Sequence, residues 1–406
     1  MTDPKWQALR RETQAVRVAV APSQYGENSE ALYLTSGYLQ PDAATSARRF
    51  AGEEEGYTYG RSSNPTVTSF EQRLAALEGA EACIATASGM SAIMLMCFSL
   101  LKAGDHVIIS QSMFGSTLKL IGSEFARFGV ETSIVPQTDL AAWQAAIRPG
   151  VTRLLFAETP TNPLTELCDI AALADLAHNA GALLAVDNCF ASPALQQPMR
   201  FGADIVMHSG TKYLDGQGRV LAGALCAPQK MVTEQFLPVQ KNSGMVLSPF
   251  NAWVVLKGLE TLDLRVKAQS GLTLELAQWL EAHPAVARVY YPGLVSHPQH
   301  ALAMRQMSGC GGAVLSFDVK ASSPQQARAR AFHVLDSLQV LSLCTNLGDT
   351  KTLCAHPAST SHGKLSEAQR QAAGIGQGLI RVAVGLEHPQ DVQNDLARGL
   401  NTLDSL

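Results

Sequence analysis

The sequence predicts an α/β protein, with a mostly parallel sheet in a large domain and a smaller α+β domain toward the C-terminus. Helix-like and strand-like patterns alternate from residue 64 to about 258, and this organisation changes beyond about 259. A chain of 406 residues is also too long for one ordinary hydrophobic core. We therefore expect an N-terminal arm over 1–63, a large α/β domain over 64–258 and a smaller α+β domain over 259–406.

Residues 53–65, EEEGYTYGRSSNP, lie at the end of the expected arm and show weak periodicity with Gly, Asn and Pro as breaks. Such a segment is typical of an extended chain. Because an extended arm buries little apolar surface of its own, we expect it to contact a neighbouring subunit.

Short apolar runs mark the expected strands of the large domain. They cover residues 83–86, 106–109, 131–135, 152–157, 182–186 and 204–207. The expected helices between them cover 65–77, 88–101, 116–128 and the segment from the cap Asp169 to the terminating Gly181. Helices of this length between strands require crossover connections, which favour parallel pairing.

The smaller domain has a different pattern. A strongly helical stretch covers 252–281, followed by a Gly-rich strand (311–319), a helix (324–338), a strand (379–384) and a last helix (389–403). A cleft between two packed domains is a natural ligand site.

Composition narrows the classes of function. A hydrophobic fraction of 46% with 16% charged residues predicts a well-packed globular protein. The net charge of −4 and the lack of long Lys/Arg runs argue against nucleic-acid or anionic-membrane partners. No apolar stretch reaches membrane-span length, and the first residues lack a signal-peptide pattern, so we expect a cytoplasmic protein.

Cysteine and histidine spacing predicts no metal site. The 8 cysteines form no CxxC pair and are expected to be reduced. His297 and His300, like His356 and His362, have no acidic or Cys partner at a matching spacing.

Asp187 and Lys212 follow two neighbouring expected strands. Because the carboxyl ends of parallel strands face the ligand crevice, both side chains are expected to reach one pocket. Ser209 and Thr211 flank the lysine with hydroxyl groups. A carboxylate, an amine and a set of phosphate donors indicate a pyridoxal phosphate (PLP) site with Lys212 as the Schiff-base lysine. The alternative is a surface lysine and a turn-capping aspartate.

Ser88, Gly89 and Met90 open an expected helix, whose free N–H groups and dipole favour a phosphate; the alternative is an ordinary Ser cap. Arg381 is a charge in an apolar strand, so it should pair either with a substrate carboxylate or with a protein carboxylate. The segment 216–218, GQG, lacks the third glycine of a dinucleotide fingerprint, which argues against a nicotinamide dehydrogenase.

Taken together, the motifs resemble the cystathionine γ-synthase-type family of fold-type I PLP-dependent enzymes, which have an aspartate aminotransferase-like fold. The motifs occur in family order: YTYGRSSNPT, ASGMSA, ETPTNP, VDN, SGTKY, LGD, HPAS and RVAVGLE. They extend from residue 57 to residue 387, so the resemblance covers nearly the whole chain.

The resemblance implies a role for each motif. Lys212 would carry the cofactor, and Asp187 would pair with the pyridine nitrogen and keep it protonated. Ser209 and Thr211 would hold the phosphate together with the Ser88–Met90 turn.

Further roles follow from the same resemblance. Asn162 would contact the ring hydroxyl, and Arg381 would bind the substrate α-carboxylate. Tyr59 and Arg61 would reach the phosphate from the neighbouring subunit, with Tyr59 also near the substrate. Members of the family are usually homotetramers built from two catalytic dimers.

The sequence departs from the family pattern at two positions. The ring-stacking residue, usually Tyr, is Phe114, so stacking is kept while the phenol is lost and Lys212 must carry more of the proton transfer. The position before Leu347, often Ser, is Asn346, which puts its contact near the substrate carboxylate in question.

The segment 215–219, DGQGR, resembles the O-succinylhomoserine sulfhydrylase branch of the family. That branch makes homocysteine and succinate from O-succinylhomoserine and sulfide in methionine biosynthesis. Cystathionine γ-synthase and methionine γ-lyase activities are the alternatives, and a catalytically inactive PLP-fold binding protein is an alternative of another class. An inactive protein would be expected to have lost Lys212, Asp187 or Arg381. Arg219 could meet the distal succinyl carboxylate or be structural.

Overall fold

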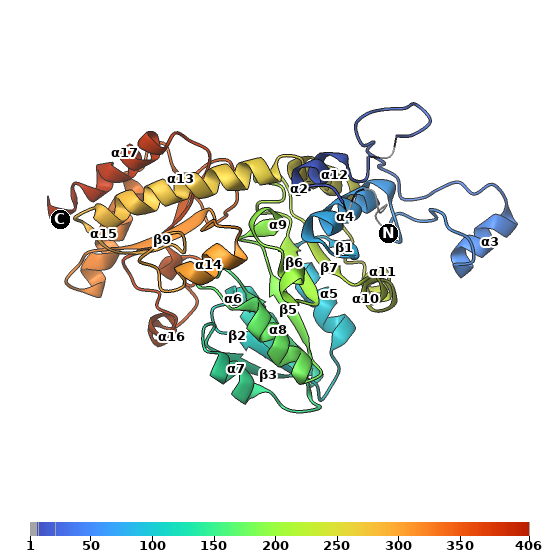
Figure 1. The fold of residues 1–406 in the computed structure, drawn as a ribbon, viewed down its shortest axis with the longest axis horizontal. Coiled ribbons are helices and arrows are strands. Elements are labelled where there is room, and N and C mark those ends of the chain that lie inside the picture. Colours follow the sequence, from blue (N-terminus) through green and yellow to red (C-terminus); the bar gives the residue numbers. More distant parts are fainter. Residues whose placement is uncertain (1–5, 7, 21, 406) are drawn as a thin grey trace.

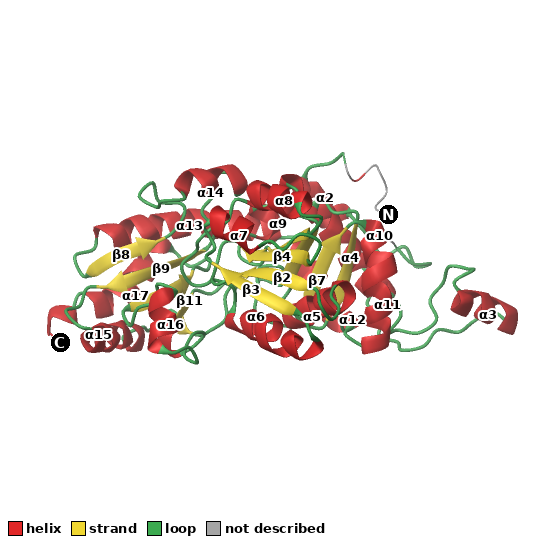
Figure 2. Cartoon of the chain, turned by 90° about the horizontal axis from the view of Figure 1, so that it is seen from below, coloured by secondary structure: helices red, strands yellow, loops and turns green. Residues whose placement is uncertain are grey.

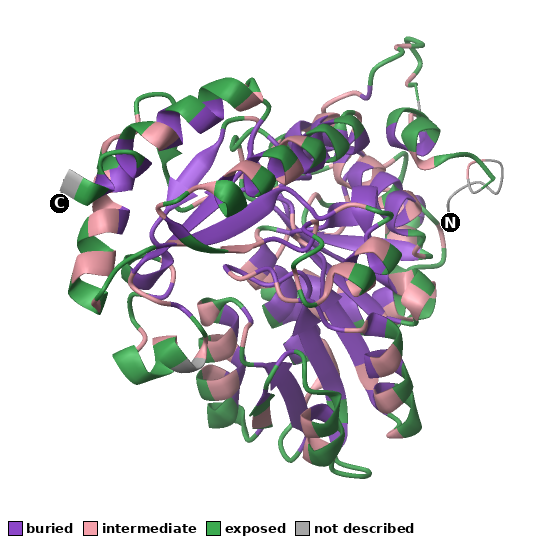
Figure 3. Cartoon of the chain, turned by 60° about the vertical axis from the view of Figure 1, so that its left-hand side comes forward, coloured by how far each residue is buried: buried purple, intermediate pink, exposed green. Residues whose placement is uncertain are grey.

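The computed structural model describes residues 6, 8–20 and 22–405. These residues form a 7-stranded sheet and a 5-stranded sheet, each covered by helices. Figure 1 shows the long helix α13 (Leu262–Ala282) running from the helices beside the larger sheet to those of the smaller one. Figure 3 shows the strands as the most buried part of the molecule.

The larger sheet is mostly parallel, which confirms the expected fold class. Its strands are β1 (Ala82–Thr86), β2 (His106–Ser110), β3 (Glu131–Val135), β4 (Thr152–Glu158), β5 (Leu183–Asp187), β6 (Ile205–Ser209) and β7 (Gly223–Ala227). They lie in the order β1-β7-β6-β5-β4-β2-β3. β7 pairs antiparallel with β1 and β6, whereas β2 to β6 pair in parallel.

Helices cover both faces of this sheet because alternate side chains of each strand point to opposite faces. On one face lie α4 (Pro65–Glu78), α7 (Leu140–Ala146), α8 (Ile170–Asn179), α9 (Ser192–Leu195) and α12 (Pro249–Leu259). On the other lie α5 (Gly89–Leu100), α6 (Gly115–Lys119), η1 (Leu120–Glu124), η2 (Phe125–Phe128) and η4 (Val232–Phe236). Short helices η3 (Pro198–Phe201), α10 (Gln229–Met231) and α11 (Leu237–Ser243) complete this part.

The smaller sheet is built mainly from antiparallel strands. Its order is β10-β11-β12-β9-β8, with β8 (Val286–Tyr290), β9 (Val314–Val319), β10 (Ser342–Leu343), β11 (Leu353–Ala355) and β12 (Leu379–Ala383). α13, α15 (Pro324–Asp336) and α17 (Pro389–Leu400) pack with this sheet. The remaining elements are α14 (His300–Gln306), η5 (Pro357–Ser359), α16 (Glu367–Ala372) and η6 (Leu403–Ser405).

The single helix expected over 252–281 is wrong, because the structure has two helices, α12 and α13, with a break between Leu259 and Leu262. Gly258 packs against the preceding loop, where an added Cβ would lie 2.3 Å from the carbonyl oxygen of Leu214. Arg265 in turn donates to the carbonyl oxygen of Gly258 over 2.8 Å. The break therefore arises from tertiary contacts that helix periodicity does not encode.

Other expected boundaries also change. The helix expected over 116–128 is the irregular run α6, η1 and η2, which contains π and 3₁₀ turns. The Gly-rich strand expected over 311–319 begins at Val314. Strands β7, β8, β10 and β11 were not expected from the apolar pattern.

The N-terminal arm expected over 1–63 contains two helices, α2 (Arg11–Arg17) and α3 (Ala43–Ala51). Residues 1–5, 7 and 21 of this range lie outside the described residues. Figure 1 shows α3 far from the body of the chain, and the apolar side chains of Leu39 and Phe50 beside it are 100% and 72% exposed. In the part of the chain that the structure describes, no helix is long and apolar enough to cross a membrane.

Candidate active site

A pocket of about 670 Å³ opens at the carboxyl ends of β4, β5 and β6. Most of the predicted site residues line it. They are Ser88, Gly89, Met90, Phe114, Asn162, Asp187, Ser209, Thr211, Lys212, Asn346 and Arg381. The rule that parallel strand ends meet at one edge therefore locates the site correctly.

Lys212 follows β6, and its amine lies at the wall of the pocket toward the smaller sheet. Its Nζ donates a 2.7 Å hydrogen bond to Oδ1 of Asn346. Burial lowers the pKa of Lys212, and the charge of Arg381 adds to this effect, while Cys189 and Asp187 oppose it. A lowered pKa makes the neutral amine more accessible near neutral pH.

Gly348 explains how Asn346 reaches the lysine. The segment carrying Asn346 passes so close to Lys212 that a Cβ at Gly348 would lie 2.8 Å from the Lys212 carbonyl carbon and 2.6 Å from Tyr213 N. The backbone at Gly348 also has a φ of +79°. Both the close approach and the left-handed backbone favour glycine at this position.

Asp187 and Glu158 lie directly opposite each other at the ends of β5 and β4. Asp187 accepts a 3.0 Å hydrogen bond from Cys189 N, but burial raises its pKa. Burial also raises the pKa of Glu158 well above its ordinary value, and the neighbouring Asp187 charge adds to this. Glu158 accepts hydrogen bonds from the backbone N–H groups of Phe114 (2.9 Å) and Asn162 (3.1 Å).

Glu158 was not predicted as a site residue. Its signal in the sequence is that it ends a buried strand, as Asp187 does. It lines the pocket and fixes the backbone of Phe114 and Asn162, both of which were predicted to contact the cofactor.

The first turn of α5 faces Ser209 at the end of β6. A Cβ at Gly89 would lie 2.9 Å from Ser209 Cβ, so glycine is required for this approach. Ser88 caps the helix by accepting from Ser91 N. Among the described residues, no acceptor lies within hydrogen-bond distance of the N–H groups of Gly89 and Met90. These donors beside Ser209 suit a bound anion.

Arg381 crosses from β12 to the larger sheet. Its Nη1 donates to Asn162 Oδ1 (3.2 Å), and its Nη2 donates to the carbonyl oxygens of Thr345 (3.0 Å) and Asn346 (2.9 Å). Burial lowers the pKa of Arg381. Within the described chain no carboxylate pairs with this guanidinium, and its buried Nε has no partner. The structure therefore disfavours the alternative of an ion pair with a protein carboxylate.

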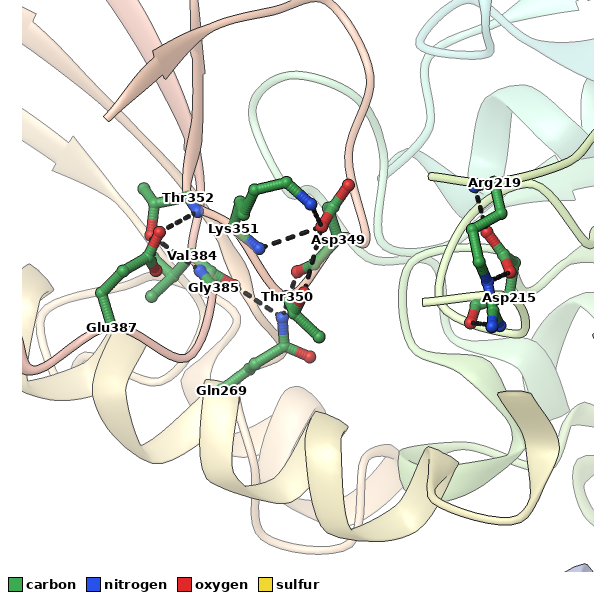
Figure 4. A network of polar contacts seen from close by, with 10 residues as sticks. All are labelled: Asp215, Arg219, Gln269, Asp349, Thr350, Lys351, Thr352, Val384, Gly385 and Glu387. Atoms are coloured by element: carbon green, nitrogen blue, oxygen red, sulfur yellow. Dashed lines mark hydrogen bonds and ion pairs between the residues drawn. The ribbon is translucent and has the colours of Figure 1, made fainter. Parts of the chain in front are cut away.

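Three residues that sequence reasoning considered do not line this pocket. Tyr59 is half-exposed, and the Arg61 guanidinium lies 5.4 Å from its ring centroid and bonds to the carbonyl oxygen of Lys241. Figure 4 shows Arg219 folded onto Asp215, with a 2.8 Å ion pair. Arg219 also donates to the carbonyl oxygen of Val254, which is in keeping with its structural alternative.

The loop that carries Asn346 is held by a polar network (Figure 4). Asp349 accepts hydrogen bonds from the backbone N–H and the amine of Lys351, each of 3.0 Å. Gln269 on α13 donates to the carbonyl oxygens of Asp349 (2.8 Å) and Val384 (2.9 Å). This network ties the loop to the end of β12 and so fixes Asn346 relative to Arg381.

A second cavity, of about 470 Å³, adjoins the first and shares Phe114, Asn162, Thr360 and Ser361 with it. Lys119 and Lys364 also line this cavity. The two amines give it a cationic wall beyond Phe114.

Residues 12–401 match the family of Cys/Met metabolism PLP-dependent enzymes. The chain belongs to this family. It is 55% identical to the O-succinylhomoserine sulfhydrylase of Pseudomonas aeruginosa, over 97% of this chain and 95% of that protein. It is 39% identical to an L-methionine gamma-lyase of Fusobacterium nucleatum, over 96% and 98% of the two chains. A Campylobacter jejuni protein solved with N'-pyridoxyl-lysine-5'-monophosphate has a TM-score of 0.91 and 31% identity, over 97% of this chain and 100% of that one.

The residues of the pocket fit the cofactor that defines this PLP-dependent family. The Gly89 turn leaves free N–H donors where a Cβ would fill the space, and Ser209 and Thr211 add hydroxyl groups beside it. Asp187 and Lys212 stand in the same pocket, as a pyridine partner and an amine require. PLP is therefore the cofactor of this enzyme.

Proposed function

We propose that this PLP-dependent enzyme converts O-succinylhomoserine and sulfide into homocysteine and succinate, as an O-succinylhomoserine sulfhydrylase of methionine biosynthesis. The observation that carries the proposal is the 55% identity, over almost the full length of both chains, to a protein of that name. The lower identity of 39% to a methionine gamma-lyase makes elimination the second candidate.

The pocket supports a division of labour in holding the cofactor. We assign the phosphate to Ser209, Thr211 and the turn of Ser88, Gly89 and Met90, since this is the anion-binding end of α5. We assign the ring to Phe114 for stacking, to Asn162 for the hydroxyl and to Asp187 for the nitrogen.

Substrate binding is assigned to Arg381, with Asn346 beside it. The guanidinium lacks a protein carboxylate, so the α-carboxylate of an amino-acid substrate can complete its bonding. That contact would hold the substrate Cα near Lys212, because Asn346 bonds to the amine and, through its carbonyl oxygen, to Arg381.

Lys212 performs the proton transfers in this proposal. When bound, PLP supplies an electron sink that stabilises negative charge generated on the substrate. The buried amine of Lys212 removes the proton from Cα, which its lowered pKa favours. A proton is then lost from Cβ, the Cγ–O bond breaks to release succinate, and hydrosulfide adds at Cγ. Return of protons to Cβ and Cα gives homocysteine.

The second cavity supports a succinyl donor. A distal succinyl carboxylate extends beyond the amino-acid part of the substrate and would meet a positive wall there. Lys119 and Lys364 provide that wall, whereas Arg219 is already paired with Asp215.

We propose that the active enzyme is a cytoplasmic homotetramer made of two catalytic dimers. The exposed apolar side chains of the arm, and the position of Tyr59 and Arg61 outside their own pocket, support an arm that completes the site of a neighbouring subunit. The 8 unpaired cysteines are in keeping with a reducing compartment.

Product analysis tests the proposed reaction. Purified enzyme loaded with PLP is given O-succinylhomoserine with sulfide and cysteine together, and the products are identified. Homocysteine as the main product is expected. Mainly cystathionine would indicate a cystathionine γ-synthase, and 2-oxobutanoate with ammonia alone would indicate a lyase. A protein that binds PLP and gives no product would support the inactive binding protein.

A further inference from the structure

A buried carboxylate joins the ends of β5 and β6 behind the cofactor pocket. Glu78 is the last residue of α4 and is fully buried. Its Oε1 lies 2.5 Å from Nε2 of His208 and accepts a 2.8 Å hydrogen bond from Nδ2 of Asn188. One oxygen atom therefore contacts both strand ends.

The two partners of Glu78 are sequence neighbours of predicted cofactor residues. Asn188 directly follows Asp187, the last residue of β5, and His208 directly precedes Ser209, the last residue of β6. Alternate side chains of a strand point to opposite faces of a sheet. Ser209 lines the pocket, so His208 points to the opposite face, where α4 packs.

The network extends to a third strand end. Gln196 donates to Asn188 Oδ1 (3.0 Å) and to the carbonyl oxygen of Thr159 (2.9 Å), the residue after Glu158 at the end of β4. Asn188 donates back to the carbonyl oxygen of Gln196 over 2.9 Å. All of these side chains are buried, and a buried network with such bonds rigidifies the groups that it joins.

We propose that Glu78 is a positioning residue of the cofactor site, which fixes the separation between Asp187 and the Ser209–Lys212 segment by holding Asn188 and His208 with one oxygen. Misplacement of reactive groups by 1 Å can cost about a hundredfold in rate. The proposal rests on the PLP cofactor of the family and is independent of the acyl donor proposed above.

The test compares Glu78→Gln with a matched control on the same helix face. Glu71 lies two turns earlier on α4, and its carboxyl accepts a 2.8 Å hydrogen bond from Ala85 N of β1. Burial raises the pKa of Glu71 to about 7. Glu71→Gln therefore also removes a buried carboxyl from α4, at a site that contacts neither β5 nor β6.

Two readouts need no substrate. The first is the dissociation constant of PLP, measured by titrating the apoenzyme. The second is the pH at which the visible absorption band of the holoenzyme changes. For Glu78→Gln we expect PLP binding to weaken by about tenfold, the loss typical of a hydrogen bond to a charged group, together with a shifted midpoint of the band. For Glu71→Gln we expect both to stay within about twofold.

A double-mutant cycle with His208→Gln tests whether Glu78 acts through His208. If it does, the double variant binds PLP no more weakly than the weaker single variant. If Glu78→Gln fails to fold, Asn188→Ala replaces it, since this change leaves the Glu78–His208 contact and is expected to weaken PLP binding and shift the band.

The proposal is overturned by a folded Glu78→Gln enzyme with unchanged PLP affinity and an unchanged band, or by equal changes in Glu71→Gln. It is also overturned if Asn188→Ala, used in its place, leaves both readouts unchanged. None of these measurements contains an acyl donor, so their failure is distinguishable from a failure of the proposed reaction.

Discussion

The amine of Lys212 and the side-chain amide of Asn346 meet at 2.7 Å, although 133 residues separate them in the chain. The hydrogen bond joins the end of β6 to the loop between β10 and β11. Asn346 also presents its carbonyl oxygen to Arg381, so one residue contacts the predicted base and the predicted carboxylate receptor. The position that departs from the family pattern thus retains a place in the site.

Asn346→Ala is expected to lower kcat by about tenfold while PLP binding stays within about twofold. The change removes the acceptor that orients the Lys212 amine, and a hydrogen bond to a charged group contributes about 1.5–3 kcal/mol. Steady-state kinetics and a PLP titration check both parts. Asn346→Asp serves as the comparison, since it keeps an acceptor oxygen at this position. An unchanged kcat in the Ala variant would contradict a role for this contact.

Gly89→Ala is expected to weaken PLP binding by tenfold or more, since the new methyl group would lie 2.9 Å from Ser209 Cβ and push the first turn of α5 away. Displacing the turn moves the N–H donors that we assign to the phosphate. Gly122→Ala is the matched control, because a Cβ at this helical glycine would meet nothing within 4 Å. Equal PLP affinity in both variants would argue against the assigned phosphate site.

Lys212→Ala is expected to abolish turnover and the covalent attachment of PLP, because no other amine lines the pocket among the described residues. Mass spectrometry after borohydride reduction of the holoenzyme detects the attachment, and product assays measure turnover. The variant should still bind PLP noncovalently through the phosphate site. Full activity in this variant would disprove the assignment of Lys212.

The strand-end rule predicted the core of the site from sequence. Asp187 and Lys212 both follow buried strands, and the parallel sheet brings those ends together whatever the detailed packing. Gly89 and Arg381 could be found for local reasons, as a helix-opening glycine and as a charge in an apolar strand. Each of these signals lies within a few residues of the side chain concerned.

The remaining features depend on contacts between distant segments. Glu158 becomes a neighbour of Asp187 through the register of β4 and β5, which apolar periodicity does not specify. Asn346 reaches Lys212 because Gly348 allows a close approach of two chains. The break between α12 and α13 likewise follows from the packing of Gly258 against Leu214. Sequence patterns within one element carry no information on such pairs.

Acidification is expected to destabilise the protein partly through His297. Burial lowers the pKa of His297 to about 4, with help from the charges of Arg288 and His300, and its Nδ1 accepts a hydrogen bond from Gln299 N. Between about pH 4 and about pH 6.5 the unfolded chain binds a proton that the folded chain excludes, so stability falls as pH falls. The drop in Tm from about pH 7 to about pH 5 should be smaller in His297→Gln; an equal drop would contradict this.

Lys119→Ala is expected to raise KM for O-succinylhomoserine by about tenfold and to leave KM for O-acetylhomoserine within about twofold. The acetyl ester has no distal carboxylate, so the cationic wall of the second cavity should matter for the succinyl ester alone. Lys364→Ala should act in the same direction. Lys230→Ala, on α10 and outside both cavities, controls for the loss of a surface charge. If Lys119→Ala and Lys364→Ala raise KM equally for both esters, the second cavity binds a part that the esters share, and the succinyl carboxylate must be held elsewhere.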